Sequence, residues 1–525
     1  MFKNTMKLLG FTLKREWKYL TIWIVGIVAF SFAVALAFPS LYPDKTSLLV
    51  LKTTYNMPTI RSMLGPVFGY QDASLNIAMA FSIECLLWVC LPAAMMSIFL
   101  VIRNTRADEE AGITEQILSL PVGRFAKSTA AILCALIANI VLTLLLFITT
   151  YASNLDGITF MGSLSYALSI GSAGFIFAAI TLIGCEIFST ASGATTFAFA
   201  IFLISFLVRG IGDMKENILS YLSPLGLPLM NFPFYKDNNI LLLYLLIASV
   251  VLILISFGVS LCRDTGAGII AARQGSATGK IRSTFGLAFR LLRTTIISWL
   301  VGVYLIGLSY GTVIPTIKDF LKNNGTLSNL VSSFDSKNLQ NGYIAMILMI
   351  SSILLSVPVI MMFGKLYKEE RKSRVEQVLS RPVSKPKIFA SYLAVSIIIM
   401  AILPLFLALG MYSAAPSFID LPVVLKACYA YLPAIFVMLG IECFFTGVFP
   451  KLKVLNWLLF TYSFVFLYFG PLLKTPKWLN NYTPFGHISQ LPVQKLDATP
   501  LYVLSAIAVV LIIFGFIGYR KRDME

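Results

Sequence analysis

Three acidic residues lie inside long apolar stretches and are the side chains whose type and setting most suggest chemistry. They are Glu84, Glu186 in the segment GCEIF, and Glu442 in the segment GIECF. If these stretches cross a membrane, a charged carboxylate there is costly unless it is paired. It then marks either a proton-transfer group or an anchoring hydrogen bond or ion pair. The similar settings of Glu186 and Glu442 favour anchoring by roughly two to one, whereas Glu84 has no counterpart.

Other catalytic or metal-binding chemistry has few residues to work with. His487 is the only histidine. The segment GSATGK at 275–280 resembles a phosphate-binding loop, but three residues rather than four separate its glycines, and Ile281 stands where Ser or Thr is required. The cysteines all fall within or at the ends of apolar stretches, so we expect small packing residues. They are Cys85, Cys90, Cys134, Cys185, Cys262, Cys428 and Cys443. We therefore expect no metal site, no nucleotide site and no catalytic constellation.

The composition sets the class of protein that must position these residues. Of the 525 residues, 58% are hydrophobic and 12% are charged, which is far more apolar than a soluble domain. A membrane-spanning helix needs roughly 20 apolar residues. On this basis we predict an all-α polytopic membrane protein with twelve spans. They are 19–38, 76–102, 128–151, 161–188, 194–210, 240–262, 294–316, 342–364, 389–413, 423–449, 455–473 and 501–519.

The distribution of charge predicts the orientation. The whole formal net charge of +17 falls in the amino terminus, the loops after even-numbered spans and the carboxyl tail. The positive-inside rule places these parts in the cytoplasm. Basic residues beside apolar spans indicate contact with a lipid bilayer rather than with nucleic acid. We expect a multi-pass protein of the bacterial cytoplasmic (plasma) membrane with both termini cytoplasmic.

A polar segment between the second and third spans occurs again in the second half of the chain. DEEAGITEQILSLPV at 108–122 returns as EERKSRVEQVLSRPV at 369–383. Proline disfavours helix in the residue before it, so each segment predicts a short helix that ends before Pro121 or Pro382. In the first copy Ile113, Ile117 and Leu118 would share an apolar side, while Asp108, Glu115 and Gln116 would face water or a partner.

Other repeats divide the chain into two halves. Residues 1–18 and the region before the seventh span both place apolar residues at helical spacing among basic ones, as interfacial helices do. Trp23 and Trp299 begin a further match at a constant offset of 276. We predict an interfacial amphipathic helix at 1–18 and a first six-helix half at 19–262. A cytoplasmic linker with a second interfacial helix would follow at 263–293, and a second six-helix half at 294–525.

Aromatic residues follow one helical face in the fifth and eleventh spans. Such residues could line a cavity for a hydrophobic cargo, or they could face lipid or pack against other helices, and the second interpretation takes about 60% of the weight. The residues are Phe199, Phe202, Phe206, Phe460, Phe464 and Tyr468.

These segments carry a family resemblance. EQILSLPV and EQVLSRPV after a second span, the interfacial helix before the first span, and RDTGAG after the sixth span resemble permeases of the ABC-2 exporter class. Arg522 and Asp523 in the tail echo Arg263 and Asp264. More narrowly, the duplicated layout is similar to the tetronasin-resistance-like subfamily, which is associated with export of polyketide antibiotics.

The resemblance implies a division of labour between this chain and its partners. In that family the cytoplasmic helix after the second span, called the coupling helix, docks on a separate ATPase subunit. The role would fall to Asp108, Glu109, Glu115, Gln116 and Leu118, and to Glu369, Glu370, Glu376, Gln377 and Leu379. Two such helices imply two nucleotide-binding subunits, copies of one polypeptide, which would carry ATP and Mg²⁺. The chain itself would be a transport subunit without a cofactor, moving a hydrophobic or amphiphilic antibiotic, drug, lipid or peptide out of the cell.

Two other readings are compatible with twelve spans. A proton-coupled drug transporter of the major facilitator type would have to use Glu84, Glu186 or Glu442. The loop after the second span, however, lacks the glycine, Asp-Arg and Gly-Arg-Arg pattern of that class. A sensor or immunity component would bind an antimicrobial compound without moving it.

Overall fold

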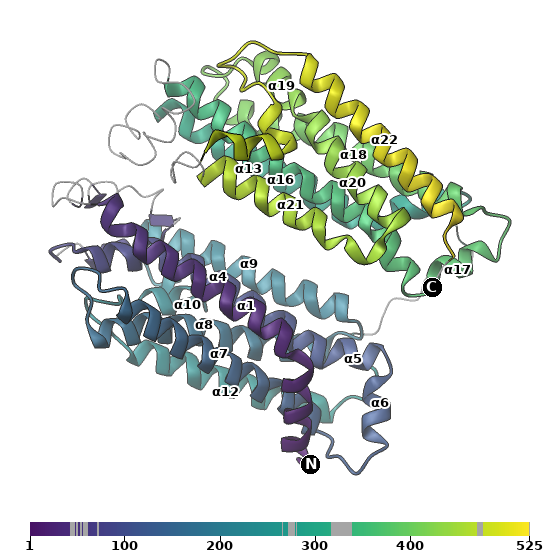
Figure 1. The fold of residues 1–525 in the computed structure, drawn as a ribbon. Coiled ribbons are helices and arrows are strands. Elements are labelled where there is room, and N and C mark those ends of the chain that lie inside the picture. The colour runs from purple at the N-terminus through teal and green to yellow at the C-terminus, as the bar shows by residue number, and fades with distance from the viewer. Residues whose placement is uncertain are drawn as a thin grey trace. The chain divides into compact units, whose positions relative to one another are not determined.

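The computed structural model describes residues 1–42, 48, 51–52, 55, 61–62, 64–70, 73–264, 266–270, 279, 281–316, 339–469 and 476–523. The chain divides into two compact units, Met1–Gly275 (unit 1) and Ser276–Glu525 (unit 2) (Figure 1). Among the described residues, eleven helices are long and apolar enough to cross a membrane, and one isolated bridge, between Phe188 and Ile270, is the only β pairing. The prediction of an all-helical polytopic membrane protein is confirmed.

Unit 1 is a bundle around two deeply buried helices, α4 and α8. Helix α8 packs against α4, α7 and α12, and small residues let these helices approach closely. A side chain at Gly174 of α8 would collide with the Asn139 amide of α7, which donates to the Ser97 hydroxyl of α4 at 2.9 Å. The helices are α1 (Thr5–Leu41), η1 (Val67–Tyr70), α4 (Ile77–Asn104), α5 (Arg106–Glu110), α6 (Ile113–Leu118), α7 (Ala126–Ala152), α8 (Phe160–Ile187), α9 (Ala191–Lys215), α10 (Leu219–Leu222), α11 (Gly226–Leu229) and α12 (Ile240–Leu261).

Unit 2 has the same kind of core around α16, with the closest packing in two helix pairs. Helix α13 lies against α18, and α20 lies against α22. A Cβ atom on Gly410 would come within 2.2 Å of the Tyr304 carbonyl, and one on Gly447 within 1.9 Å of the Gly515 carbonyl. The helices are α13 (Thr284–Val313), η2 (Ile314–Thr316), α16 (Leu339–Glu370), α17 (Arg374–Leu379), α18 (Lys385–Ala414), α19 (Leu421–Ala430), α20 (Leu432–Val448), η3 (Pro450–Leu452), α21 (Val454–Phe464), η4 (Val465–Phe469), η5 (Lys477–Tyr482), η6 (Pro484–His487) and α22 (Thr499–Lys521).

Three expected elements differ in detail from the structure. The interfacial stretch 1–18 and the first span form one helix, α1, from Thr5 onward. The tenth span is divided at Tyr431 into α19 and α20, with proline in the first turn of α20. The eleventh span is an 11-residue α-helix that continues as a five-residue π-helix to Phe469, and the expected remainder lies outside the described residues. Apart from Gly279, the segment 275–280 also lies outside them.

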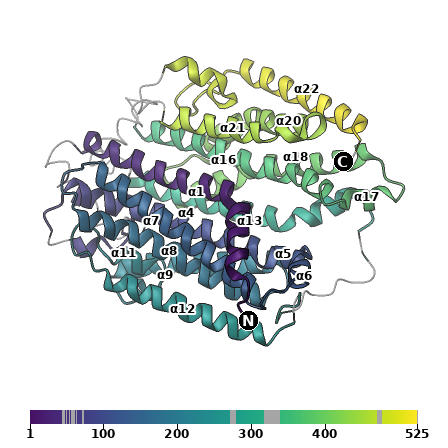
Figure 2. The same cartoon turned by 60° about the horizontal axis from the view of Figure 1, so that its bottom comes forward.

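The repeated polar segments occupy one end of each unit. Helices α5 and α6 lie beside the amino terminus, where the Gly123 and Phe125 amides donate to the Lys3 and Met1 carbonyls (Figure 1). Helix α17 lies at the end of unit 2 near the carboxyl terminus (Figure 2), where Lys385 donates to the Arg522 carbonyl at 2.9 Å. Each bundle thus presents its short helices at the end where its terminal segment packs.

Candidate functional site

Each repeated segment forms a short helix, α6 or α17, that begins directly after a sharp turn. In unit 1 the chain turns at Gly112, whose φ of 74° lies in the left-handed region that glycine adopts at little cost. The turn divides the expected single helix into α5 and α6. In unit 2 the corresponding residue, Ser373, has a φ of 52° and precedes α17. The same turn therefore sets the direction of α6 and α17.

The two short helices present matching faces. Thr114 and Val375 are buried at equivalent positions, and they turn Glu115 and Gln116 in α6, and likewise Glu376 and Gln377 in α17, to the outside. Leu118 and Leu379 are half-buried at the ends of these helices. Each unit therefore offers an exposed Glu-Gln pair beside a half-buried leucine.

The acidic residues that begin each segment are turned inward. We expected Asp108 to face water or a partner, but it is 7% exposed. It accepts from Arg15 of α1 at 2.9 Å and lies 3.3 Å from the Lys127 ammonium of α7. That expectation was wrong because helical periodicity takes no account of cations supplied by neighbouring helices. Glu369 and Glu370 are also buried in ion pairs, and the partly buried Glu109 is in an ion pair as well.

Arg263 is the centre of the ion-pair cluster in unit 1. It follows α12, donates to Glu109 at 2.9 Å and also binds Glu186 of α8. Glu109 also accepts hydrogen bonds from the Arg106 guanidinium at 2.7 Å and from the Gly266 amide at 2.8 Å. Burial by itself lowers the pKa of the Arg263 guanidinium, but its hydrogen bonds and charge interactions with Glu109 and Glu186 raise that pKa above its usual value. The cluster ties α5 to the ends of α8 and α12.

Unit 2 carries the same pairing in simpler form. Arg522, which follows α22, binds Glu370 at the end of α16. Lys385 donates to the Arg522 carbonyl, as Arg124 donates to the Arg263 carbonyl at 2.7 Å. Arg124 and Lys385 are 261 positions apart, as are Glu109 and Glu370. The pairing of each acid with its arginine was missed in the sequence, although the shared Arg-Asp after the sixth and twelfth spans was a signal that could have suggested it.

The acids of the membrane spans have different surroundings. Glu186 pairs with Arg263, while Glu442 pairs with Lys453 at 2.7 Å and accepts from Asn456 at 3.1 Å. Glu84 accepts hydrogen bonds from the Tyr42 hydroxyl at 3.0 Å and the Tyr55 hydroxyl at 2.9 Å. Its described partners are neutral side chains, so Glu84 differs chemically from the two paired acids.

The aromatic residues suggested for a cargo cavity pack within their own units. Phe199 contacts Phe99 of α4 with ring centroids 5.4 Å apart, and Phe202 contacts Phe177 of α8 at 5.3 Å. Phe206 lies under the Arg209 guanidinium at 4.9 Å. In unit 2, Phe460 and Phe464 pack against the core, and Tyr468 stacks on Phe464 at 5.6 Å. These contacts are those of packing side chains.

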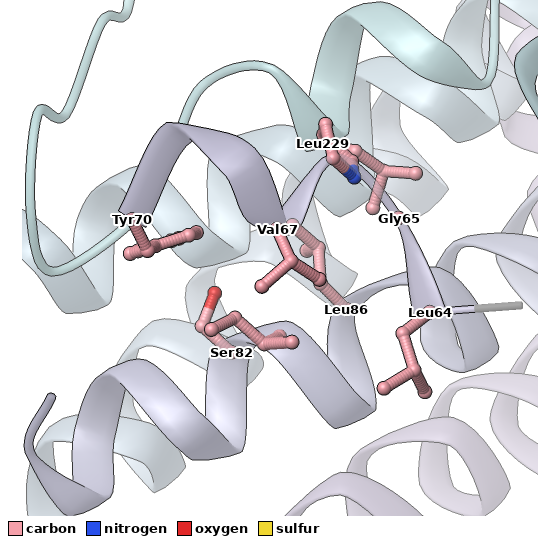
Figure 3. A pocket seen from close by; sticks show the side chains of 9 residues that line it. Leu64, Gly65, Val67, Tyr70, Ser82, Leu86 and Leu229 are labelled. Carbon is pink, nitrogen blue, oxygen red and sulfur yellow. The ribbon is translucent and has the colours of Figure 1, made fainter. Parts of the chain in front are cut away.

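A small pocket lies at the opposite end of unit 1 (Figure 3). Leu64, Gly65 and Val67 lie over Ser82 and Leu86 of α4, with Leu229 of α11 beside them. Its volume of about 20 Å³ has room for one water molecule, so it does not accommodate a drug-sized cargo.

Comparison with known proteins gives a consistent result over both units. A family model described as the C-terminal domain of the multidrug efflux system permease Rv1217c matches residues 7–259 and 281–520. The chain is also similar to the multidrug efflux system permease protein Rv1217c of Mycobacterium tuberculosis (strain ATCC 25618 / H37Rv). The identity is 29% over 536 residues, covering all of this chain and 96% of the relative. Each matched stretch contains one of the two repeated polar segments.

Proposed function

Because the chain belongs to the Rv1217c family of multidrug efflux permeases, we propose that it is the membrane subunit of an ATP-driven ABC-2 exporter, in the tetronasin-resistance-like subfamily. It is a multi-pass membrane protein and a drug-efflux permease, a transport subunit rather than an enzyme. The cargo is a hydrophobic or amphiphilic compound, such as an antibiotic, drug, lipid or peptide, which leaves the cell.

One observation carries the proposal: each unit presents the same short helix with an exposed Glu-Gln pair. We propose that α6 and α17 dock on two ATPase subunits, which are copies of one polypeptide and bind ATP and Mg²⁺. The positive-inside rule places both helices and both termini on the cytoplasmic side of the bacterial plasma membrane. The second segment carries Arg371, Lys372, Arg374 and Arg381, while the first is acidic, so the two docking contacts differ in strength.

The buried ion pairs supply the mechanical link between docking helix and spans. Arg263 joins α5 to α8 and α12, and Arg522 joins the end of α16 to the end of α22. A displacement of α6 or α17 is therefore transmitted to several spans rather than absorbed by a loop. Closure of the ATPase pair would push both helices together and turn the permease from an inward-open to an outward-open state.

Proton coupling is the second candidate, and the neutral partners of Glu84 are the observation that favours it. The test is export of an amphiphilic fluorescent dye in inverted vesicles, with an uncoupler present, for the wild type and for Glu84→Gln. ATP should drive transport in both, and vanadate should stop it. The ATP-driven assignment is wrong if dye transport stops when the uncoupler removes the proton gradient and if Glu84→Gln lowers the transport rate roughly 100-fold. A loss of that size is expected when an essential proton-transfer group is removed. Glu186→Gln and Glu442→Gln complete the comparison.

A further inference from the structure

The two units differ at the place where the interfacial stretch meets the polar segment. In unit 1, Asp108 lies between the Arg15 and Lys127 side chains. The repeat offsets of 276 and 261 place Leu291 and Ile388 at the positions of Arg15 and Lys127 in unit 2, and Glu369 at the position of Asp108. Two cations that bridge helices in unit 1 are thus replaced by aliphatic side chains.

A groove opens in unit 2 at this place. It has a volume of about 400 Å³, within the range of small-molecule sites. Leu287 and Leu291 of α13, Val375 and Val378 of α17, and Ile388 of α18 line its walls. We call this site the α13–α17 groove. Its apolar walls suit a hydrocarbon chain.

The rim of the α13–α17 groove is basic. Lys372 and Arg374 both line it and are exposed. Glu369, the acid at the rim, is already paired with Lys365 at 3.0 Å and Arg374 at 3.3 Å. No ion pair of Lys372 occurs within the part of the chain that the structure describes. The rim therefore carries surplus positive charge beside an apolar wall.

A ligand that fits this groove has a hydrocarbon chain for the apolar walls and a negative charge for the basic rim. The position of the groove indicates where such a ligand would come from. It lies where α16 ends at Glu370 and α18 begins at Lys385, so it opens at the end of helices long enough to span a membrane, where lipid headgroups would lie. Basic residues at this depth attract anionic lipids. We propose that the α13–α17 groove binds an anionic phospholipid of the adjacent leaflet, with an acyl chain between α13 and α17 and the phosphate on Lys372 and Arg374. This proposal depends on the membrane location of the chain and not on its energy source.

The test measures phosphatidylglycerol and phosphatidylcholine binding to the delipidated full chain by native mass spectrometry. The wild type should retain phosphatidylglycerol preferentially. Removing each basic rim residue should weaken its binding about fivefold, so Lys372→Gln with Arg374→Gln should weaken it about 25-fold. Arg371→Gln with Arg381→Gln removes the same charge outside the groove and should leave binding unchanged.

Filling the groove tests the acyl-chain contact separately. Val378→Trp should abolish preferential binding, while Ile117→Trp, the equivalent change 261 positions earlier in unit 1, should not. Leu291→Arg with Ile388→Lys recreates the side chains of unit 1 around Glu369 and should also abolish it, which covers the case that Val378→Trp does not fold. Equal binding of the two lipids by the wild type would overturn the proposal, as would equal losses in the groove variants and their controls. Unchanged phosphatidylglycerol binding together with loss of a co-purifying protein in the rim variant would assign the groove to that protein instead.

Discussion

Replacing Arg263 by alanine is expected to destabilise unit 1 by about 3–5 kcal/mol, because it leaves the buried Glu186 carboxylate without its cation and removes one of the two cations of Glu109. The Glu109 and Glu186 side chains are 8% and 2% exposed, and both bind Arg263. Glu109 keeps Arg106 as a partner, whereas Glu186 has no other ion pair among the described residues. The measurement is the midpoint of unfolding by heat or by denaturant, for the purified chain in detergent.

Arg522→Ala is the matched comparison in unit 2. Arg522 binds one carboxylate, that of Glu370, rather than two, so its loss should cost less. The unfolding midpoint of Arg263→Lys should lie between those of the wild type and Arg263→Ala. An ammonium keeps the positive charge but cannot make the paired hydrogen bonds of a guanidinium. An unchanged midpoint in Arg263→Ala would show that the cluster does not hold α5 to α8 and α12.

Reversing the charge of both exposed glutamates, Glu115→Lys with Glu376→Lys, is expected to uncouple transport from ATP hydrolysis. Coupling between sites typically amounts to 5–150-fold, so export should fall by about 5- to 150-fold while the ATPase subunits still hydrolyse ATP. Stability should not change, because both side chains are exposed. The measurement is dye export and ATP hydrolysis in the same reconstituted vesicles.

The control makes the same charge change at the other ends of the spans. Asp156→Lys with Asp420→Lys alters two exposed acids in the loops that precede α8 and α19, and export should continue at the wild-type rate. Normal export by the Glu115→Lys, Glu376→Lys chain at normal expression would contradict the docking assignment of α6 and α17.

The helical membrane fold could be predicted because each span is a long apolar run, and the repeat of 108–122 at 369–383 located the two short helices. Exposure of Glu115 followed from the local periodicity of the first copy, and the repeat aligns Glu376 with it. The burial of Asp108 could not be read this way, since it depends on Arg15, which is 93 positions away in the chain. Contacts of that kind are set by how helices pack.

The turn at Gly112 could be predicted from the sequence in only one of its two copies. The glycine is visible in the sequence, but its counterpart Ser373 carries no such signal, and only the backbone shows that both residues adopt a left-handed conformation. Likewise the pairing of Glu109 with Arg263 joins positions 154 residues apart. The repeat identified which residues correspond between the halves, while the structure identified what they bind.

The most direct test of the ATP-driven assignment is to purify the tagged chain from its native membrane in mild detergent and identify the proteins that accompany it. The account predicts a nucleotide-binding subunit, present in two copies per permease, with vanadate-sensitive ATP hydrolysis. A chain that arrives alone and hydrolyses no ATP, also after extraction that keeps the surrounding lipid, would contradict it and leave ion-coupled transport as the mechanism.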